Sequence, residues 1–227
     1  MEILWVSKSH EPPLPIQIQA LTTLKGQRRV QIDHRHIENA QVLAREFRQG
    51  GYGDLVCIAP QSVMARITQE GVHPLRPCMT YTAPTIGGRR APDLRLPNGN
   101  FWFSHFERVE KVALNLVAVH PATDVRRVLR ITRHLLQRPE EAALKHVFGP
   151  RVVIETLQPT ESSMSAEWVI QQANQYRATE VVLVAPWAVY KFLAERGCFA
   201  LYSQFDPANR FVALWRCLGV EERVTRV

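Results

Sequence analysis

Two stretches of the chain, Asp54-Leu-Val-Cys-Ile-Ala-Pro60 and Glu180-Val-Val-Leu-Val-Ala-Pro186, are closely alike. Outward from them, residues 40–75 align without gaps on residues 166–201, and eight of the 36 aligned positions are identical. Average amino-acid composition accounts for about two such identities. The sequence therefore predicts an internal duplication.

Each copy is expected to form a helix, a strand, a second helix and a second strand. The short apolar run is typical of a parallel strand buried on both faces. Ala-Pro ends it, because proline cannot donate to the sheet but suits the first turn of a helix. Gly71 and Gly197 are the expected left-handed ends of the second helix. Asp33 is the candidate N-cap of the first helix in the first copy. In the second copy the corresponding helix is expected to start in the serine-rich residues 162–165.

These patterns predict an α/β fold with duplicated Rossmann-like parallel sheets, helices on both faces and an inserted β-hairpin around Asn98-Gly99. The expected divisions are residues 1–82, a connection at 83–110 and a second half at 111–227. Residues 124–138 have the spacing of an amphipathic helix. Its polar face would carry Arg126, Arg127, Arg130, Arg133 and His134.

Composition limits the class of protein. The chain has 227 residues, of which 46% are hydrophobic and 22% charged, as in globular proteins. No apolar run is long enough to cross a bilayer, and the first residues lack the pattern of a secretory signal, so the expected location is the cytoplasm without membrane attachment. A net charge of +7 favours polyanionic partners such as nucleotides.

Common nucleotide and metal fingerprints are absent from the sequence. It has neither a P-loop nor a G-x-G-x-x-G turn, and no paired His-x-Ser or His-x-Thr motif of the two-histidine phosphoesterases. His34 and His36 have no cysteine or paired carboxylates nearby to complete a metal site. No cofactor and no metal are predicted.

The candidate site residues follow strands. Both halves begin with a strand that ends in histidine, at residues 3–10 and 114–120, and carboxyl ends of parallel strands are where open α/β sheets bind ligands. Ser7, Lys8, Ser9 and His10 combine hydroxyls, an ammonium and an imidazole, which can bind phosphate and move a proton. His120 and Thr123 form the matching loop. Ordinary turn residues are the alternative interpretation.

Further candidates surround the two Ala-Pro corners. Gln61 and Ser62 follow the first corner and Trp187 the second, where a helix N-terminus attracts anions. Helix capping by Ser62 and core packing by Trp187 are the alternatives. Arg89 and Arg90, after two glycines, are placed to reach phosphates.

A family resemblance rests on the first 80 residues or so. The opening, with Ser7, Ser9, His10, Pro12 or Pro13, Leu14, Gln17 or Gln19 and Leu21, resembles the strand-Ser-His-Pro-Leu opening of small accessory proteins of type III CRISPR systems. Residues 53–71 are similar to their second landmark. Here Glu11 separates the histidine from the proline, whereas His120-Pro121 has the direct pair. The chain thus resembles the CRISPR-associated Rossmann fold, or CARF.

The resemblance implies binding of cyclic oligoadenylate, with metal-independent cleavage in those members that are ring nucleases. His10, His120 and Lys8 would then be catalytic, and the other candidates would hold the ligand. A duplicated chain could supply both edges of one pocket as a pseudo-dimer; a homodimer also stays open. The alternatives are a sensor that binds without cleaving and a non-enzymatic nucleic-acid-binding module that uses the arginine-rich helix and the hairpin.

Overall fold

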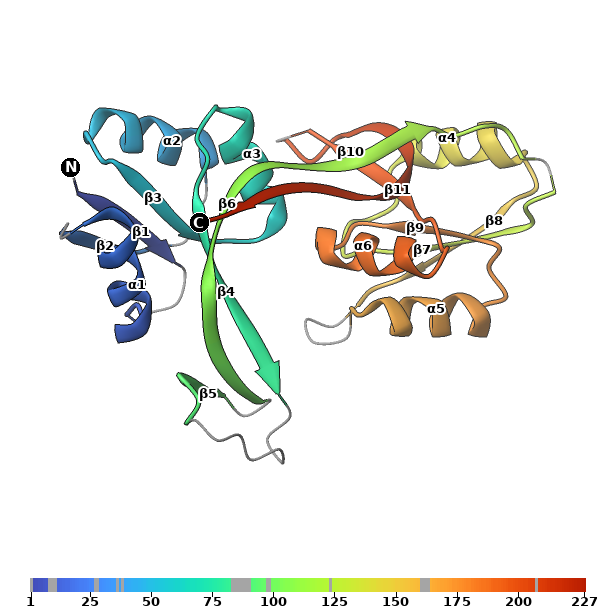
Figure 1. Cartoon of the computed structure of the whole chain (residues 1–227). Helices are drawn as coiled ribbons and strands as arrows, with labels where there is room; N and C mark the ends of the chain where they lie inside the picture. The colour runs from blue at the N-terminus through green and yellow to red at the C-terminus, as the bar shows by residue number, and fades with distance from the viewer. Residues whose placement is uncertain are drawn as a thin grey trace. The chain divides into compact units, whose positions relative to one another are not determined.

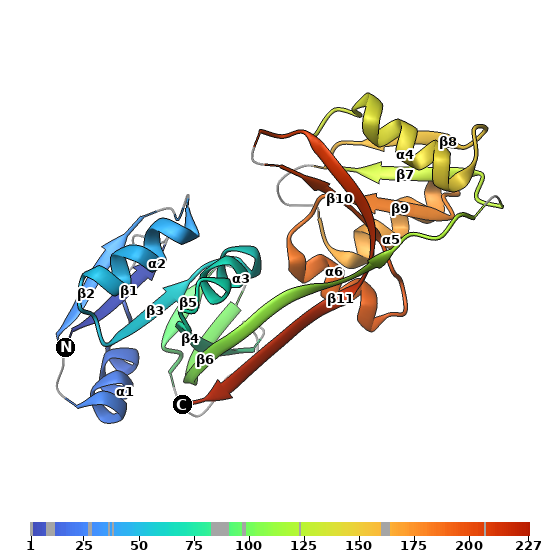
Figure 2. The same ribbon diagram turned by 90° about the horizontal axis from the view of Figure 1, so that it is seen from above.

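The computed structural model describes residues 2–7, 12–26, 29–35, 37, 39–82, 91–96, 99–122, 124–159, 164–206 and 208–227. The chain divides into two compact units (Figure 1). Unit 1 comprises Met1–Val112 and Glu222–Val227, and unit 2 comprises Ala113–Glu221. Two long strands, β6 (Gly99–Ala118) and β11 (Phe211–Arg226), contribute residues to both units (Figure 2).

Unit 1 alternates strands and helices. Its elements are β1 (Ile3–Ser7), α1 (Pro15–Lys25), β2 (Val30–His34), α2 (Ala40–Gln49), β3 (Asp54–Ile58), α3 (Gln61–Gln69) and β4 (Leu75–Thr82). The four strands are parallel in the order β2-β1-β3-β4, and β6 follows antiparallel to β4. Helix α1 covers one face of this sheet, and α2 and α3 cover the other (Figure 1).

Unit 2 has the same succession and the same strand order. Its elements are β7 (Arg127–Ile131), α4 (Arg138–Phe148), β8 (Val153–Leu157), α5 (Ala166–Gln175), β9 (Glu180–Leu183), α6 (Trp187–Glu195) and β10 (Leu201–Phe205). The parallel order is β8-β7-β9-β10, and β11 runs antiparallel to β10. Here α4 covers one face, and α5 and α6 cover the other (Figure 1).

The α/β class and the helix-strand-helix-strand order are confirmed. Helices α2 and α5 begin 126 residues apart, as do α3 and α6, which is the offset of the sequence match. The hairpin is present as well, because β5 (Leu94–Leu96) pairs antiparallel with the start of β6. No helix among the described residues is long and apolar enough to cross a membrane.

Helix caps were predicted with mixed success. Ser165 caps α5 as expected, since its side chain accepts the backbone N–H of Trp168. The expected cap Asp33 is wrong: it lies within β2, and α2 begins later. Asn39 caps that helix instead, because its Oδ1 accepts the N–H groups of Gln41 and Val42.

The amphipathic helix predicted over residues 124–138 is also wrong. Residues 127–131 form β7, and α4 starts only at Arg138. Val128, Leu129 and Ile131 are completely buried, as expected for a strand covered on both faces. The arginines recur at helical spacing. The segment nevertheless forms a strand, because its residues are buried in the sheet beneath the covering helices.

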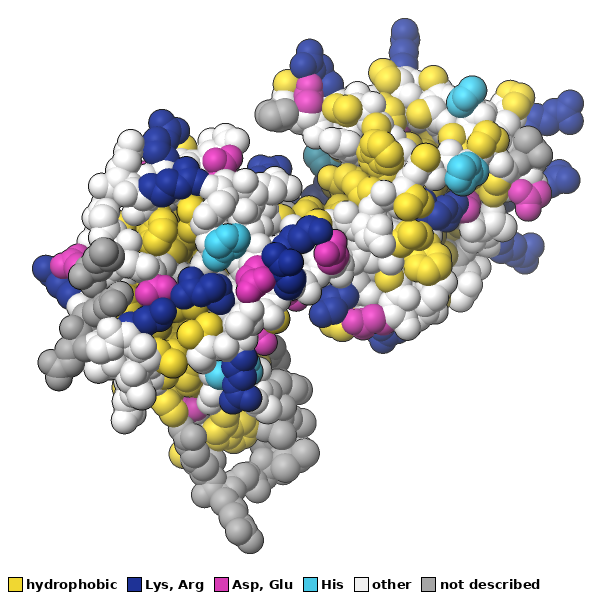
Figure 3. Space-filling view, turned by 45° about the horizontal axis from the view of Figure 1, so that its top comes forward, with side chains coloured by type: hydrophobic (Ala, Val, Ile, Leu, Met, Phe, Trp, Pro, Cys, Tyr) yellow, Lys and Arg dark blue, Asp and Glu magenta, His cyan; other side chains and the backbone are white. Residues whose placement is uncertain are grey.

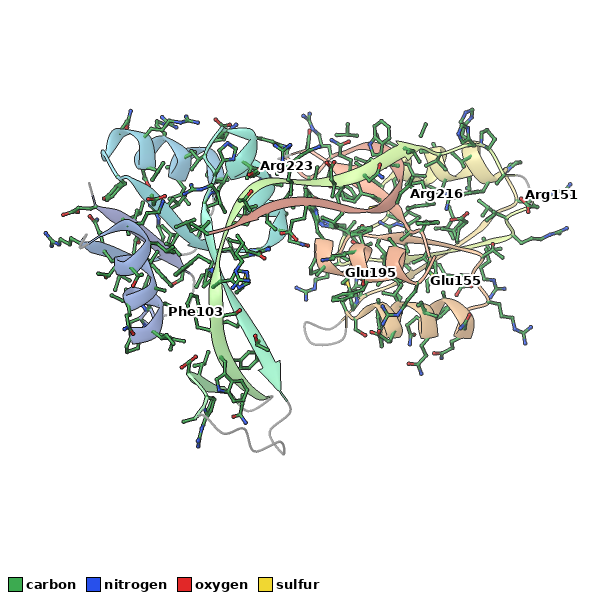
Figure 4. The ribbon with its side chains drawn as sticks, viewed as in Figure 1. Phe103, Arg151, Glu155, Glu195, Arg216 and Arg223 are labelled. Carbon is green, nitrogen blue, oxygen red and sulfur yellow. The ribbon has the colours of Figure 1, made fainter. Side chains whose placement is uncertain are left out.

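Aromatic residues fill the α1 side of unit 1. Trp5 packs edge-on against Phe106 with ring centroids 6.3 Å apart, and Phe103 packs on Phe106 at 5.0 Å. Phe103, labelled in Figure 4, lies on β6 and packs with Leu21 of α1. This cluster ties β6 to the parallel strands, so it stabilises the sheet on which the candidate site stands.

The glycines that end α3 and α6 give a stability prediction. Gly71 and Gly197 have φ of 74° and 71°, in the left-handed region. We expect Gly71→Ala and Gly197→Ala each to lower the free energy of unfolding by about 1 kcal/mol, because a Cβ is disfavoured there. Gly71→Asn is the control and should cost less, since asparagine tolerates this conformation. Urea denaturation measures both, and unchanged stability in the alanine variants would contradict the expectation.

Candidate functional site

The carboxyl ends of the parallel strands of unit 1 bring predicted residues together. Strands β1, β2 and β3 end in register at Ser7, His34 and Ile58. From β1 the chain first forms β2 on one side and then crosses to form β3 on the other side of β1. The strand order therefore reverses at β1. Such a reversal at the carboxyl ends is the usual ligand site of an open α/β sheet.

A cavity of about 170 Å³ lies at this edge. It is bounded by the ends of β1 and β3, by the middle of β4, by β5, and by the start of α1 with the residues before it. The lining residues are Trp5, Ser7, Pro12, Pro13, Leu14, Gln17, Ile58, Pro77, Met79 and Leu94. A small number of polar groups in an apolar wall is the common character of small-molecule sites.

Two polar side chains of this cavity are held in place. Ser7 is buried, and its Oγ lies 3.4 Å from Nδ1 of His34 on the neighbouring strand. Gln17 accepts the backbone N–H of Leu14 at 2.9 Å through Oε1, while its Nε2 lies 3.7 Å from the sulfur of Met79. The first turn of α1 is thereby fixed against β4, which shapes one wall of the cavity.

The N-terminus of α3 offers a further polar group. Gln61 is the first residue of the helix, and its Oε1 is buried with no hydrogen-bond partner among the described residues. A buried oxygen without a partner costs about 1–3 kcal/mol. The N-cap position is Pro60, and no side chain caps the helix, so Ser62 does not have the capping role considered for it. A helix N-terminus without a side-chain cap favours an anion nearby.

Several predicted site residues lie outside the described part of the chain. Lys8, Ser9 and His10 follow β1 directly in the sequence. Arg89 and Arg90 belong to the segment 83–90, and Thr123 lies between Ala122 and Asp124. Their assignments stay predictions from the sequence.

His120 does not lie at the carboxyl edge of the parallel strands of unit 2. It is exposed, and two residues later the N–H of Ala122 donates to the carbonyl of Val147 at the C-terminal end of α4. The chain then enters β7 at its amino end. The strand 114–120 was expected to open the second parallel sheet, but its residues to Ala118 belong to β6, and β7 takes that place. Trp187 is half-buried at the start of α6.

The residues that occupy the carboxyl end of β7 were missed as a site. Val128 and Arg130 pair with Glu180 and Val182, just as Ile3 and Trp5 pair with Asp54 and Val56. By this register, Thr132 stands where Ser7 stands. The order Ser7-Lys8 is thus matched by Thr132-Arg133. A histidine follows in each case, His10 three residues after Ser7 and His134 two residues after Thr132. The duplicated pattern reaches these residues only with a one-residue gap, because β1 and β7 are related by an offset of 125 residues and the matched segments by 126.

The Thr132 loop is ordered by its own contacts. The Thr132 backbone N–H donates to the carbonyl of Leu157, and its Oγ1 accepts the N–H of His134 at 3.1 Å. The His134 ring stacks on Phe205 of β10, with centroids 5.0 Å apart and planes at 24°. A cation, a hydroxyl and stacked rings are therefore gathered at this edge of unit 2.

Beneath this loop lies a buried charge pair. Arg130 and Glu140 are completely buried, and the guanidinium donates to both carboxylate oxygens, at 3.1 and 2.8 Å. Arg130 also donates to Thr156 Oγ1 at 3.0 Å, and Ser203 donates to Glu140 at 2.7 Å. Strands β7, β8 and β10 and helix α4 are thereby joined through one polar network.

Much of the remaining basic charge is also paired with acid. Arg108 lies 2.9 Å from Asp54, and Arg127 lies 3.2 Å from Glu155. Figure 3 shows Lys and Arg side chains beside Asp and Glu side chains on the visible face of each unit. The arginine-rich helix face does not exist, since Arg130 is buried in β7 and Arg127 is paired with Glu155. Arg126 and Arg133 are exposed, and the nucleic-acid-binding alternative stays a prediction.

Comparison with known proteins gives no relative. The chain matches no protein-family model, and no curated protein or solved structure is significantly similar to it.

The buried pair gives a second prediction. Glu140→Gln leaves Arg130 buried without its counter-charge, so we expect the free energy of unfolding to fall by about 3–5 kcal/mol. Replacing both residues, as Arg130→Met with Glu140→Leu, should recover most of that loss. Urea denaturation monitored by circular dichroism measures the change.

The matched control lies on the same helix. Lys145 and Glu141 form an exposed pair one turn apart, and Glu141→Gln should cost only about 0.3–0.5 kcal/mol. If Glu140→Gln and Glu141→Gln proved equally mild, the structural role of the buried network would be wrong.

Proposed function

We propose that the protein binds cyclic oligoadenylate, at the carboxyl ends of its parallel strands, and cleaves it as a metal-independent ring nuclease of CRISPR antiviral signalling. The proposal treats the two units as copies of one Rossmann-like, CARF-type domain. The observation that carries it is the recurrence, around the carboxyl end of β1 in unit 1 and of β7 in unit 2, of a hydroxyl and a cation followed by a histidine.

This combination suits the chemistry of RNA phosphodiesters. The ribose 2′-oxygen would form a bond to the adjacent phosphorus while the bond from phosphorus to the 5′-oxygen breaks, leaving a 2′,3′-cyclic phosphate. One proton leaves the 2′-hydroxyl and another reaches the 5′-oxygen, which is work for histidine near neutral pH. The ring must be held in line for attack, and a lysine or arginine would stabilise the developing negative charge.

The roles follow from the positions of the residues. Ser7, Ser9 and Gln61 would contact the ligand, Lys8 would hold a phosphate, and His10 would transfer a proton. At the edge of unit 2, Arg133 would hold a phosphate and His134 would transfer a proton. The sequence pattern had assigned the site of unit 2 to the loop of His120 and Thr123. Arg89 and Arg90 remain candidates for phosphate contacts.

The direct test incubates the purified protein with cyclic tetra-adenylate and cyclic hexa-adenylate in EDTA. Chromatography should show linear products that end in a 2′,3′-cyclic phosphate. His10→Ala should slow cleavage about 100- to 10,000-fold, the range of general acid–base catalysis. His146→Ala, an exposed histidine on α4, is the control and should leave the rate unchanged.

The outcomes separate the two main functions. Binding of intact rings without turnover would identify a sensor instead of an enzyme. Intact rings with no binding would eliminate the proposal as a whole.

Gln61 offers a second test that does not need turnover. Gln61→Met removes the buried oxygen that has no partner among the described residues, so we expect the free energy of unfolding to rise by about 1 kcal/mol. On the proposed function the Gln61 amide turns toward the ligand on binding, so the same variant should bind cyclic oligoadenylate about tenfold more weakly, the loss of one hydrogen bond. Calorimetry and urea denaturation measure the two effects.

Gln69→Met, at the exposed end of the same helix, is the matched control and should change neither quantity. Lower stability of Gln61→Met with unchanged affinity would show that the side chain is structural.

A further inference from the structure

Three side chains with different metal-binding atoms meet on the β4–β6 pair of unit 1. Cys78 lies directly opposite His105 in the antiparallel register, and Glu107 follows two residues along β6. The thiol sulfur, an imidazole nitrogen and a carboxylate oxygen all lie within 4.8 Å of one another. No other group of three such ligands occurs among the residues that the structure describes.

The backbone explains why these residues converge. Residues at i and i+2 of a strand point to the same face, and the opposite residue of an antiparallel neighbour has its Cβ about 5 Å away. His105 and Glu107 therefore share one face of β6 with Cys78 beside them. The three ligands stand on paired strands, which hold them more closely than a loop would.

Hydrogen bonds from neighbouring residues orient His105 and Glu107 within the cluster. Ser104 Oγ lies 2.9 Å from Nδ1 of His105, so Nε2 is the nitrogen that faces Glu107 Oε1, at 3.4 Å. Arg76 holds the other carboxylate oxygen of Glu107 at 2.7 Å and also contacts Glu222. Such hydrogen bonds behind the ligands are typical of protein metal sites, where they fix ring and carboxylate orientation.

An ion pair between His105 and Glu107 alone would not require a thiol. Cys78 is half-buried beside them, whereas Cys57 and Cys217 are buried in the cores and Cys198 is exposed. A thiolate, an imidazole and a carboxylate together form a donor set that Zn²⁺ accepts. Three protein ligands leave the fourth tetrahedral position to water or to a substrate atom, as in catalytic zinc sites.

We propose that Cys78, His105 and Glu107 bind one Zn²⁺ ion in unit 1, with the fourth position open. This site is separate from the carboxyl-edge cavity and does not depend on the proposed ring-nuclease activity, which needs no metal. Its ligands are Sγ, Nε2 and Oε1, and Ser104 and Arg76 orient two of them.

The test titrates the full-length, metal-free protein with Co²⁺ and then Zn²⁺. Cobalt should bind one equivalent and give a near-ultraviolet thiolate-to-cobalt charge-transfer band, which zinc then abolishes by displacement. Cys78→Ser should lose the band, and His105→Asn should lose stoichiometric binding. Ser104→Ala should weaken zinc binding about 10- to 100-fold, because it removes only an outer contact.

Control variants exclude other thiols and surface histidines. Cys198→Ser and His146→Asn should bind cobalt and zinc as the unchanged protein does. Circular dichroism of each variant checks that the fold persists. Absence of the charge-transfer band in the unchanged protein, or its persistence in Cys78→Ser, would overturn the proposal.

Discussion

Burial of short parallel strands on both faces is the constraint on which each unit depends. The central strands have almost no solvent side, so most of their residues are apolar and most polar groups lie at the ends, as Ser7 does at the end of β1. Arg130 inside β7 is the exception, and it is buried only together with its counter-charge Glu140. Helices must then cover both faces, and each connection between two parallel strands returns along one face of the sheet. Polar chemistry consequently gathers at the strand ends, which is why the candidate site lies there and not on the faces.

The same constraint explains which features could be predicted from sequence. The apolar run, the Ala-Pro corner and the glycine at the helix end each have a local physical cause, and all three recur 126 residues apart. They predicted the helices and strands of residues 40–75 and 166–201. The carboxyl edge of unit 1 followed from the strand direction, and Ser7 proved to line the cavity there.

The failures had tertiary causes. Residues 124–138 have arginines at helical spacing, and nothing local shows that Arg130 meets Glu140 inside the protein. From the sequence, Arg130 was therefore assigned to an exposed helix face. In the structure it is buried, because Glu140, ten residues later, supplies its counter-charge. The cluster of Cys78, His105 and Glu107 was missed for a similar reason: Cys78 precedes His105 by 27 residues in the sequence, and only the strand register brings them together.

The two units differ at one position in a way that bears on ligand binding. Trp5 and Arg130 occupy the same register beside Val56 and Val182. In unit 1 the tryptophan lines a cavity whose polar lining residues, Ser7 and Gln17, are held in place by hydrogen bonds. In unit 2 the arginine is already satisfied by Glu140, and displacing that carboxylate would expose a buried charge. At this register position the interior of unit 2 thus serves stability, whereas in unit 1 the same position lines a cavity at the carboxyl edge of the strands.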